Sequence, residues 1–413
     1  MSFSIRCKKA VTRRQFLGSA TALGFPAIVR AAAGTTAPLD VAMARLLSSL
    51  GIPGGALGIA RAGRLVYAKG FGVASRERNT GVTADSRFRI ASVSKPFTAA
   101  AVLRLVEQGK LKLNEPVLPR LGLQPLGGIS DARWGRITAR HLLNHTGGWD
   151  KGVSGDAMFK SPQICRETGI EGPADARTTV RWMLGRRLDF DPGTRYSYCN
   201  FGYCLLGRLI ENVTGESYEH AMRTLVLRPC GIHHMDLGHT LRPLSQEVNY
   251  YHGDGSLGDS VFPRLPSRVP WPYGSFSLEA NDANGGWVAN VADLLRFATS
   301  LDEFSSSPLL QRSSLQAIYG GAAPGSQEGG EYQGLGWVVR PKGQGGRPNL
   351  SHPGGLPGTK TFLARLGDGF DWAVLFNSRP ASFDVVNQKI QNTIYQAARE
   401  ISQWPTADLF GRV

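Results

Sequence analysis

Residues 92–96 read Ser-Val-Ser-Lys-Pro and begin an apolar stretch, rich in Ala, Leu and Val, that runs to about residue 108. Helical spacing would place the side chains of Ser92 and Lys95 on one face, about one turn apart. Proline is tolerated only near the first turn of a helix, so Pro96 sets the helix start close to Ser92. A serine nucleophile needs a base within reach, and lysine can be that base when burial and the positive end of a helix lower its pKa. No other serine precedes a lysine by three residues, so this pair is a candidate catalytic unit.

A second unique pattern is Tyr198-Cys199-Asn200, which directly precedes another helical stretch. In an extended segment alternate side chains point to the same side, so Tyr198 and Asn200 would face the same region. There a phenol could shuttle a proton and an amide could orient a substrate carbonyl. The alternative is a buried tyrosine capped by an asparagine, and the residues alone leave both interpretations open.

A histidine followed by glycines, His352-Pro353-Gly354-Gly355, lies in the strand-rich C-terminal part of the chain. The sequence holds another H-x-G at His145-Thr146-Gly147, after a helical segment and before the tyrosine motif. Position favours His352, because it lies among the C-terminal strands. Pro353 lacks an N–H, which should restrict its strand to a sheet edge.

The order of predicted elements indicates two lobes built by one chain. Strands near both ends enclose a mainly helical middle, and the turn Ala62-Gly63 predicts a hairpin. Asn290 resembles the start of a capping box, and residues 250–273 read as a long loop rich in Pro and Gly. The predicted strands span residues 55–61, 64–73, 336–340, 361–365 and 372–376, and the predicted helices span residues 38–50, 92–108, 139–144, 174–186, 201–213, 218–227, 290–301 and 383–401.

Together the three motifs resemble those of the serine β-lactamase and penicillin-binding-protein family, in its class C and DD-peptidase/esterase branch. The resemblance covers roughly residues 38–405, and segments 142–147, 191–198 and 285–287 support it. It implies a single catalytic domain with an α/β, β-lactamase/transpeptidase-like fold. In that fold an antiparallel sheet is flanked by the N- and C-terminal helices, and a mainly helical lobe at roughly residues 96–330 is inserted between the sheet-forming ends.

The resemblance also implies a role for each matching residue. Ser92 would be the acylated nucleophile, Lys95 its base and Tyr198 the proton shuttle to the leaving group. Asn200 would hold the substrate amide or ester. No metal or organic cofactor is implied.

The third motif departs from the family pattern. His352 stands where class C β-lactamases carry the Lys of a K-T-G motif, as in some DD-peptidases, D-aminopeptidases and esterases of the family. Pro353 replaces a hydroxyl residue, which removes one donor for a substrate carboxylate. Gly354 and Gly355 would bind substrate beside the nucleophile, and the backbone N–H of Gly355 would form an oxyanion hole with that of Ser92.

These features predict a serine hydrolase that works through an acyl-enzyme on amides or esters, of the DD-peptidase, D-aminopeptidase or esterase type. Its substrate would be a small molecule or a peptide, with cell-wall peptides among the candidates. Two alternatives stay open: a true class C-like β-lactamase, and a penicillin-binding or sensor protein that is acylated without turnover. The changes in the third motif weaken the case for efficient β-lactam turnover.

Much of the positive charge lies at the N-terminus. The 413 residues carry a net charge of +15, and six of the positive charges fall in residues 1–33, which leaves +9 on the rest. That segment contains no acid, a twin-arginine pattern at residues 12–17, a short apolar stretch to residue 29 and alanines at 31–33. These features predict a twin-arginine export signal and a periplasmic or secreted protein, with a basic amphipathic helix as the alternative.

Several other classes are disfavoured. No apolar run reaches the roughly 18 residues of a membrane span, and no zinc-finger, helix-turn-helix or basic–aromatic pattern points to nucleic acid. The histidines at 233–239 match no zinc motif, and the glycines at 253–258 lack the strand–helix context of a nucleotide site. The G-x-S-x-G of α/β-hydrolases is absent, and four cysteines after residue 33 are too few for a disulfide scaffold.

Overall fold

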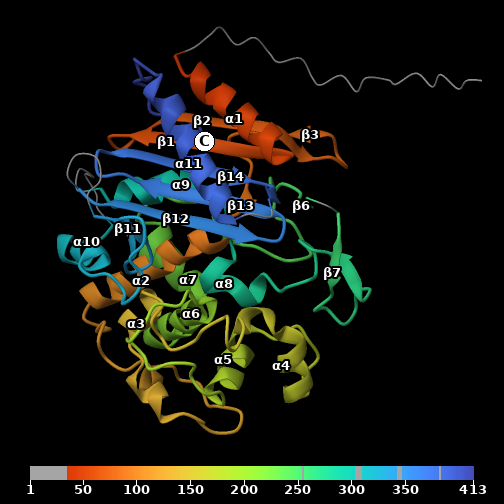
Figure 1. Ribbon diagram of the computed structural model, residues 1–413, viewed down its shortest axis with the longest axis vertical. Helices are drawn as coiled ribbons and strands as arrows, with labels where there is room; N and C mark the ends of the chain where they lie inside the picture. The colour runs from red at the N-terminus through yellow and green to blue at the C-terminus, as the bar shows by residue number, and fades with distance from the viewer. Residues whose placement is uncertain (1–34, 254, 303–308, 342–346, 381–382) are drawn as a thin grey trace, which may run out of the picture. The chain divides into compact units, whose positions relative to one another are not determined.

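The computed structural model describes residues 35–253, 255–302, 309–341, 347–380 and 383–413, and the predicted export signal lies outside these residues. Figure 1 shows the arrangement of the elements. The strands are β1 (Gly54–Arg61), β2 (Arg64–Ser75), β3 (Thr80–Gly81), β4 (Phe88–Arg89), β5 (Asp236–Leu237), β6 (Tyr251–His252), β7 (Leu257–Asp259), β8 (Arg268–Pro270), β9 (Trp287–Ala289), β10 (Tyr332–Gln333), β11 (Val338–Arg340), β12 (Asn349–Leu356), β13 (Thr359–Arg365), β14 (Phe370–Phe376) and β15 (Ser378–Arg379). The α-helices are α1 (Ala37–Leu50), α2 (Ser94–Glu107), α3 (Ala139–Leu143), α4 (Ser161–Thr168), α5 (Ala176–Leu184), α6 (Asn200–Thr214), α7 (Tyr218–Met222), α8 (Asp282–Gly285), α9 (Val291–Ser300), α10 (Arg312–Tyr319) and α11 (Phe383–Arg399). Short helical turns are η1 (Ala91–Val93), η2 (Leu118–Arg120), η3 (Ala132–Arg136), η4 (Ala157–Phe159), η5 (Arg223–Leu227) and η6 (Glu279–Asn281).

An antiparallel sheet joins the two ends of the sequence. Its eight strands follow the order β10-β11-β12-β13-β14-β1-β2-β3, so the C-terminal strand β14 pairs with the N-terminal strand β1 (Figure 1). The predicted hairpin turns at Ala62 and Gly63, whose φ angles of 48° and 77° suit a type I′ turn. The predicted fold class, an antiparallel sheet flanked by the N- and C-terminal helices beside a mainly helical region, is confirmed.

Helices cover both faces of this sheet. α1 and α11 pack on one face around Met43, Trp372 and Ile390, and α9 packs on the other (Figure 1). α9 lies so close to β1 that a Cβ at Gly58 would fall 2.8 Å from the Leu295 side chain. Glycine at this position therefore allows the helix to lie directly on the sheet.

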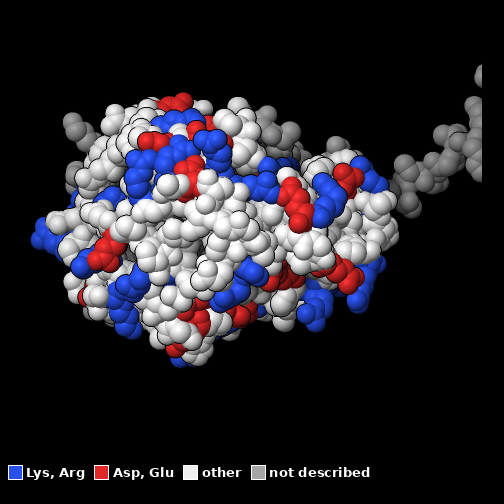
Figure 2. Space-filling model, turned by 90° about the horizontal axis from the view of Figure 1, so that it is seen from below, with Lys and Arg blue, Asp and Glu red and all other residues white. Residues whose placement is uncertain are grey.

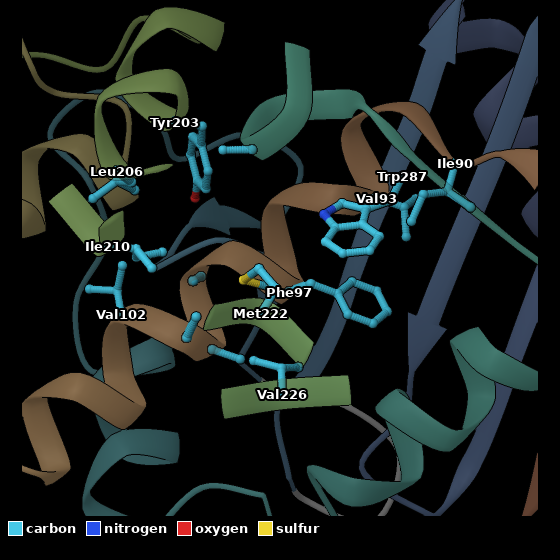
Figure 3. Packing of buried hydrophobic residues seen from close by; sticks show 14 of the residues in the cluster. Ile90, Val93, Phe97, Val102, Tyr203, Leu206, Ile210, Met222, Val226 and Trp287 are labelled. Atoms are coloured by element: carbon cyan, nitrogen blue, oxygen red, sulfur yellow. The ribbon is translucent and has the colours of Figure 1, made fainter. Parts of the chain in front are cut away.

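A larger apolar core surrounds α2. In Figure 3, Val102 of α2 lies beside Ile210 of α6, and Phe97 of α2 lies near Trp287 of β9. All but three of the fourteen residues of α2 are buried, which explains its nearly continuous run of Ala, Val and Leu. The helix that begins at the Ser-Lys pair is therefore held rigidly by its surroundings.

Two sequence-based expectations need correction. The predicted loop over residues 250–273 contains β6, which pairs with β15, and the β7–β8 hairpin. Strands of two or three residues are too short to show an alternating pattern, and Pro270 ends β8 in the manner of a strand breaker.

The strand that contains Pro353 is not the edge of the sheet, because β11 and β10 lie beyond β12. However, β11 pairs only with Asn349–Ser351, so the segment around Pro353 has a strand partner on one side alone. Proline is thus tolerated inside this sheet at a position that has no strand partner on one of its two sides.

Charges of both signs share the surface of the helical region. On the face shown in Figure 2, Lys and Arg side chains are interspersed with Asp and Glu. Arg133, for example, forms ion pairs with Asp131 and Asp191, at 2.7 and 2.9 Å. Within the described ranges, no helix is both long enough and apolar enough to cross a membrane.

Candidate active site

The predicted nucleophile lies on a turn that the sheet holds in place. Ser92 is half-buried in η1, directly before α2. The preceding residue, Ala91, has a φ of +49°, a left-handed conformation that costs a non-glycine residue on the order of 1–3 kcal/mol. Two hydrogen bonds anchor Ile90: the Thr361 hydroxyl donates to its carbonyl at 2.8 Å, and its N–H donates to the Trp287 carbonyl at 2.9 Å. Strands β13 and β9 thus stabilise the strained turn that presents the serine hydroxyl.

Lys95 lies one turn further along and is fully buried. Its Nζ donates to Ser92 Oγ at 3.1 Å, to Asn200 Oδ1 at 2.7 Å and to the backbone carbonyl of Asn284 at 2.7 Å. Burial lowers the pKa of Lys95 to about 7, against an opposing effect from the charge of Asp156. A substantial fraction of the amine is therefore neutral near neutral pH and able to accept the proton of the serine.

Tyr198 approaches Ser92 from the other side. Its hydroxyl donates to Ser92 Oγ at 2.9 Å, and its ring centre lies 5.1 Å from Lys95 Nζ. Desolvation raises the pKa of the Tyr198 phenol far above its usual value, so the hydroxyl stays protonated. One serine oxygen therefore contacts both an amine that can take a proton and a phenol that can give one.

Asn200 begins α6 and faces the same site as Tyr198. Its Oδ1 accepts from Lys95, and its Nδ2 donates to Asp156 Oδ2 at 2.6 Å. The four residues Ser92, Lys95, Tyr198 and Asn200, which lie up to 108 positions apart in the sequence, thus form one hydrogen-bonded group.

His352 lies on β12 and is only 2% exposed. Its Nδ1 lies 2.7 Å from the Pro353 carbonyl, so this nitrogen carries the hydrogen. Burial, together with the nearby charge of Lys95, lowers the pKa of His352 to about 3. His352 is consequently neutral, whereas the lysine of a K-T-G motif would carry a positive charge at the same position.

The two glycines after it differ in their surroundings. Gly354 is buried, and a Cβ there would overlap the Thr361 hydroxyl and lie 2.6 Å from the Ile90 carbonyl. Gly354 thus allows β12 to pack against the segment that precedes the nucleophile. Gly355 is half-buried, on the part of β12 that β11 leaves uncovered.

Three groups at the site were missed by the sequence-based reasoning: His145, Asp156 and the carbonyl of Asn284. His145 is buried, its Nδ1 accepts from the Cys199 N–H at 3.1 Å, and its ring centre lies 4.4 Å from that of Tyr198. Burial holds the pKa of His145 well below its ordinary value, so it is neutral. The second H-x-G motif is the sequence signal for His145, and in the structure both His145 and His352 lie near Lys95.

The chain matches the protein family described as Beta-lactamase over residues 39–393. It is 29% identical to penicillin-binding protein 4* of Bacillus subtilis over 316 residues, which cover 75% of this chain and 64% of that protein. It is 32% identical to esterase EstB of Burkholderia gladioli over 254 residues, which cover 59% of this chain and 61% of the esterase. The matched region thus spans less than two thirds of the length of these relatives.

Solved structures share the fold. An octameric penicillin-binding protein homologue from Pyrococcus abyssi superposes with a TM-score of 0.65 at 24% identity, covering 87% of this chain and 77% of that one. A D-amino acid amidase from Ochrobactrum anthropi SV3 gives 0.67 at 21% identity, covering 88% and 99%. At these identities the likeness supports the fold assignment.

Proposed function

Because this chain belongs to the β-lactamase family, we propose that it is a serine hydrolase that cleaves amides or esters through an acyl-enzyme on Ser92. The observation that carries the proposal is the pair of hydrogen bonds to Ser92 Oγ, from Lys95 Nζ at 3.1 Å and from the Tyr198 hydroxyl at 2.9 Å. A buried amine with a pKa of about 7 gives this pair a base suited to neutral pH.

In the acylation step, Ser92 Oγ attacks the substrate carbonyl carbon while neutral Lys95 takes the hydroxyl proton. The backbone N–H groups of Ser92 and Gly355 hold the developing oxyanion. Tyr198 donates its proton to the leaving nitrogen or oxygen as that bond breaks, and the Lys95 ammonium restores the proton to Tyr198. Water then attacks the acyl-enzyme, gives up a proton to the same base, and Ser92 Oγ leaves and regains its hydrogen. No metal or organic cofactor takes part.

The substrate type follows from the third motif. A lysine in the place of His352 would offer a cation to a substrate carboxylate, whereas the His352 imidazole is neutral and engaged with its own backbone. Pro353 offers no hydroxyl. These features disfavour substrates that carry a carboxylate, which include β-lactams and the peptides cleaved by DD-peptidases. They favour esters and amides without a carboxylate, of the D-aminopeptidase or esterase type, and the esterase and amidase among the similar proteins agree with this class.

A class C-like β-lactamase and a penicillin-binding protein that stays acylated are the competing functions. They are separated by incubating the purified protein with nitrocefin, a nitrophenyl ester and a fluorescent penicillin, beside Ser92→Ala. We expect ester turnover and slow nitrocefin turnover. Fast nitrocefin turnover would favour the β-lactamase, stable labelling without turnover would favour the penicillin-binding protein, and full activity of Ser92→Ala would refute all three.

The N-terminal segment supports a proposal on location. Its twin arginines, short apolar stretch and alanines fit export through the twin-arginine route to the periplasm or beyond. Replacing Arg13 and Arg14 by lysines should retain the protein in the cytoplasm, as measured by cell fractionation. Unchanged export of that variant would contradict this route.

A further inference from the structure

Asp156 lies outside all three sequence motifs, yet it joins the site directly. It immediately precedes η4, where its Oδ1 accepts from the Met158 N–H at 3.1 Å. Its Oδ2 accepts from Asn200 Nδ2 at 2.6 Å. The carboxylate is thus fixed by its own turn and held against the first residue of α6.

The Asn200 amide lies between Lys95, which hydrogen-bonds to its oxygen, and Asp156, which hydrogen-bonds to its nitrogen. A protonated Lys95 only donates, so it requires the amide oxygen, whereas a carboxylate only accepts, so Asp156 requires the amide nitrogen. During the proposed reaction Lys95 alternates between ammonium and amine. A neutral amine can accept as well as donate, so Lys95 alone would tolerate a flipped amide for part of each cycle.

We propose that Asp156 is a positioning residue that keeps the Asn200 oxygen toward Lys95 throughout the proton-transfer cycle and leaves the second N–H of the amide for a substrate carbonyl. This inference rests on the proposed function of Ser92. Asp156 acts through Asn200 and does not itself contact the serine.

The charge of Asp156 has a second, measurable consequence. It raises the pKa of Lys95, in opposition to burial. Among the described residues, the other titratable groups that face Lys95 are His145, His352, Tyr198, Tyr203 and Cys199. Burial depresses the pKa values of both histidines, raises those of both tyrosines, and raises the pKa of Cys199 to about 12, so all five are neutral around pH 7.

Lys151 is a further cation at this rim, and its Nζ lies 6.0 Å from the Tyr198 ring centre. Lys151 is present in the native protein and in the Asp156 variants, so its charge is common to both sides of the comparison. Removal of the Asp156 charge alone should therefore move the acid limb of the pH–rate profile, which reports Lys95, to lower pH.

The test compares Asp156→Asn and Asp156→Ala with the native protein in two reactions: hydrolysis of a nitrophenyl ester and labelling of Ser92 by a fluorophosphonate, each from about pH 5 to 9. Asp156→Ala loses the acceptor, and we expect kcat/KM and the labelling rate to fall about tenfold to a hundredfold. Asp156→Asn keeps one oxygen acceptor where the carboxylate offers two, to Met158 and to Asn200, so it should recover part of that rate at high pH. Its acid limb should still move to lower pH, because the charge is lost.

Asp175→Asn is the matched control. Asp175 is exposed and caps α5 through the Thr178 N–H at 2.7 Å, so this variant removes a charge from a helix cap away from the site. Its rate and acid limb should match those of the native protein. If Asp156→Ala fails to fold, as judged by thermal unfolding, the near-isosteric Asp156→Asn still tests the shift of the acid limb.

Different results would overturn the proposed function and the role of Asp156. A native protein that is neither labelled at Ser92 nor able to cleave the ester would overturn the proposed function, and the role of Asp156 with it. A native protein that is active, with Asp156→Asn showing an unshifted acid limb or Asp156→Ala showing a native rate, would overturn the role of Asp156 alone.

Discussion

Burial of Lys95 makes the stability of the fold depend on pH. In the folded protein its pKa is about 7, against 10.5 for an ordinary lysine. Between these two values the unfolded chain binds the proton and the folded protein does not, so the free energy of unfolding rises with pH. The stability cost of the buried ammonium is therefore largest below pH 7 and declines above it.

The size of the effect follows from the two pKa values. Above pH 7 the contribution of Lys95 approaches about 1.4 kcal/mol per pH unit. Between pH 6 and pH 8.5 it amounts to about 2 kcal/mol. The buried carboxyl of Asp293, whose pKa is raised to about 6, titrates at the lower end of this range. The contribution of Lys95 therefore has to be isolated by comparison with a variant that lacks the amine.

Urea unfolding of the native protein and of Lys95→Met at pH 6, 7 and 8.5 makes that comparison. The free energy of unfolding of the native protein, relative to that of the variant, should increase by about 2 kcal/mol from the lowest to the highest pH. Lys110→Met, at an exposed lysine, is the control and should show no such trend relative to the native protein. Parallel pH curves for the native protein and Lys95→Met would refute the claim that burial lowers the pKa of Lys95.

Three further substitutions test the packing and the proton path. Gly354→Ala should lower the free energy of unfolding by about 1–3 kcal/mol and slow ester hydrolysis, because its Cβ overlaps the Thr361 hydroxyl of β13 and the Ile90 carbonyl. Gly135→Ala, where a Cβ meets nothing within 4 Å, should do neither. His145→Phe leaves the Cys199 N–H without its acceptor and should destabilise the fold by about 1–3 kcal/mol in urea unfolding; a native midpoint would argue against the bond. Tyr198→Phe should lower kcat about a hundredfold or more while leaving the unfolding midpoint within error, and a native kcat would remove the tyrosine from the proton path.

The motif residues could be predicted because their chemistry imposes local spacing. Ser92 and Lys95 must lie one helical turn apart, and Tyr198 and Asn200 must alternate on an extended segment. Asp156 carries no such spacing, because its position against Asn200 depends on how the segment before α4 folds back on α6. The Asn284 group at the site is a backbone carbonyl, which has no signature in the side-chain sequence.

The two histidine motifs show a different limit. In the sequence, His145 and His352 are both candidates for the histidine of the third motif, and the neighbouring predicted strands favour His352. In three dimensions the turn after α3 places His145 against the Tyr198 ring, and β12 places His352 on the sheet, so both histidines lie near Lys95. A pairwise choice along the chain could not anticipate that long-range packing would use both. Similarly, the short β7–β8 hairpin depends on contacts between its own few residues and leaves no periodic pattern.

The proposed function requires that Ser92 becomes covalently acylated. The most direct measurement is mass spectrometry of the protein quenched with acid during turnover of a nitrophenyl ester, followed by mapping of the modified peptide. We predict a mass increase equal to the acyl group on the peptide that contains Ser92, and no increase in Ser92→Ala. Ester turnover without any adduct on Ser92, or an adduct of equal yield in Ser92→Ala, would show that hydrolysis does not proceed through an acyl-enzyme on Ser92.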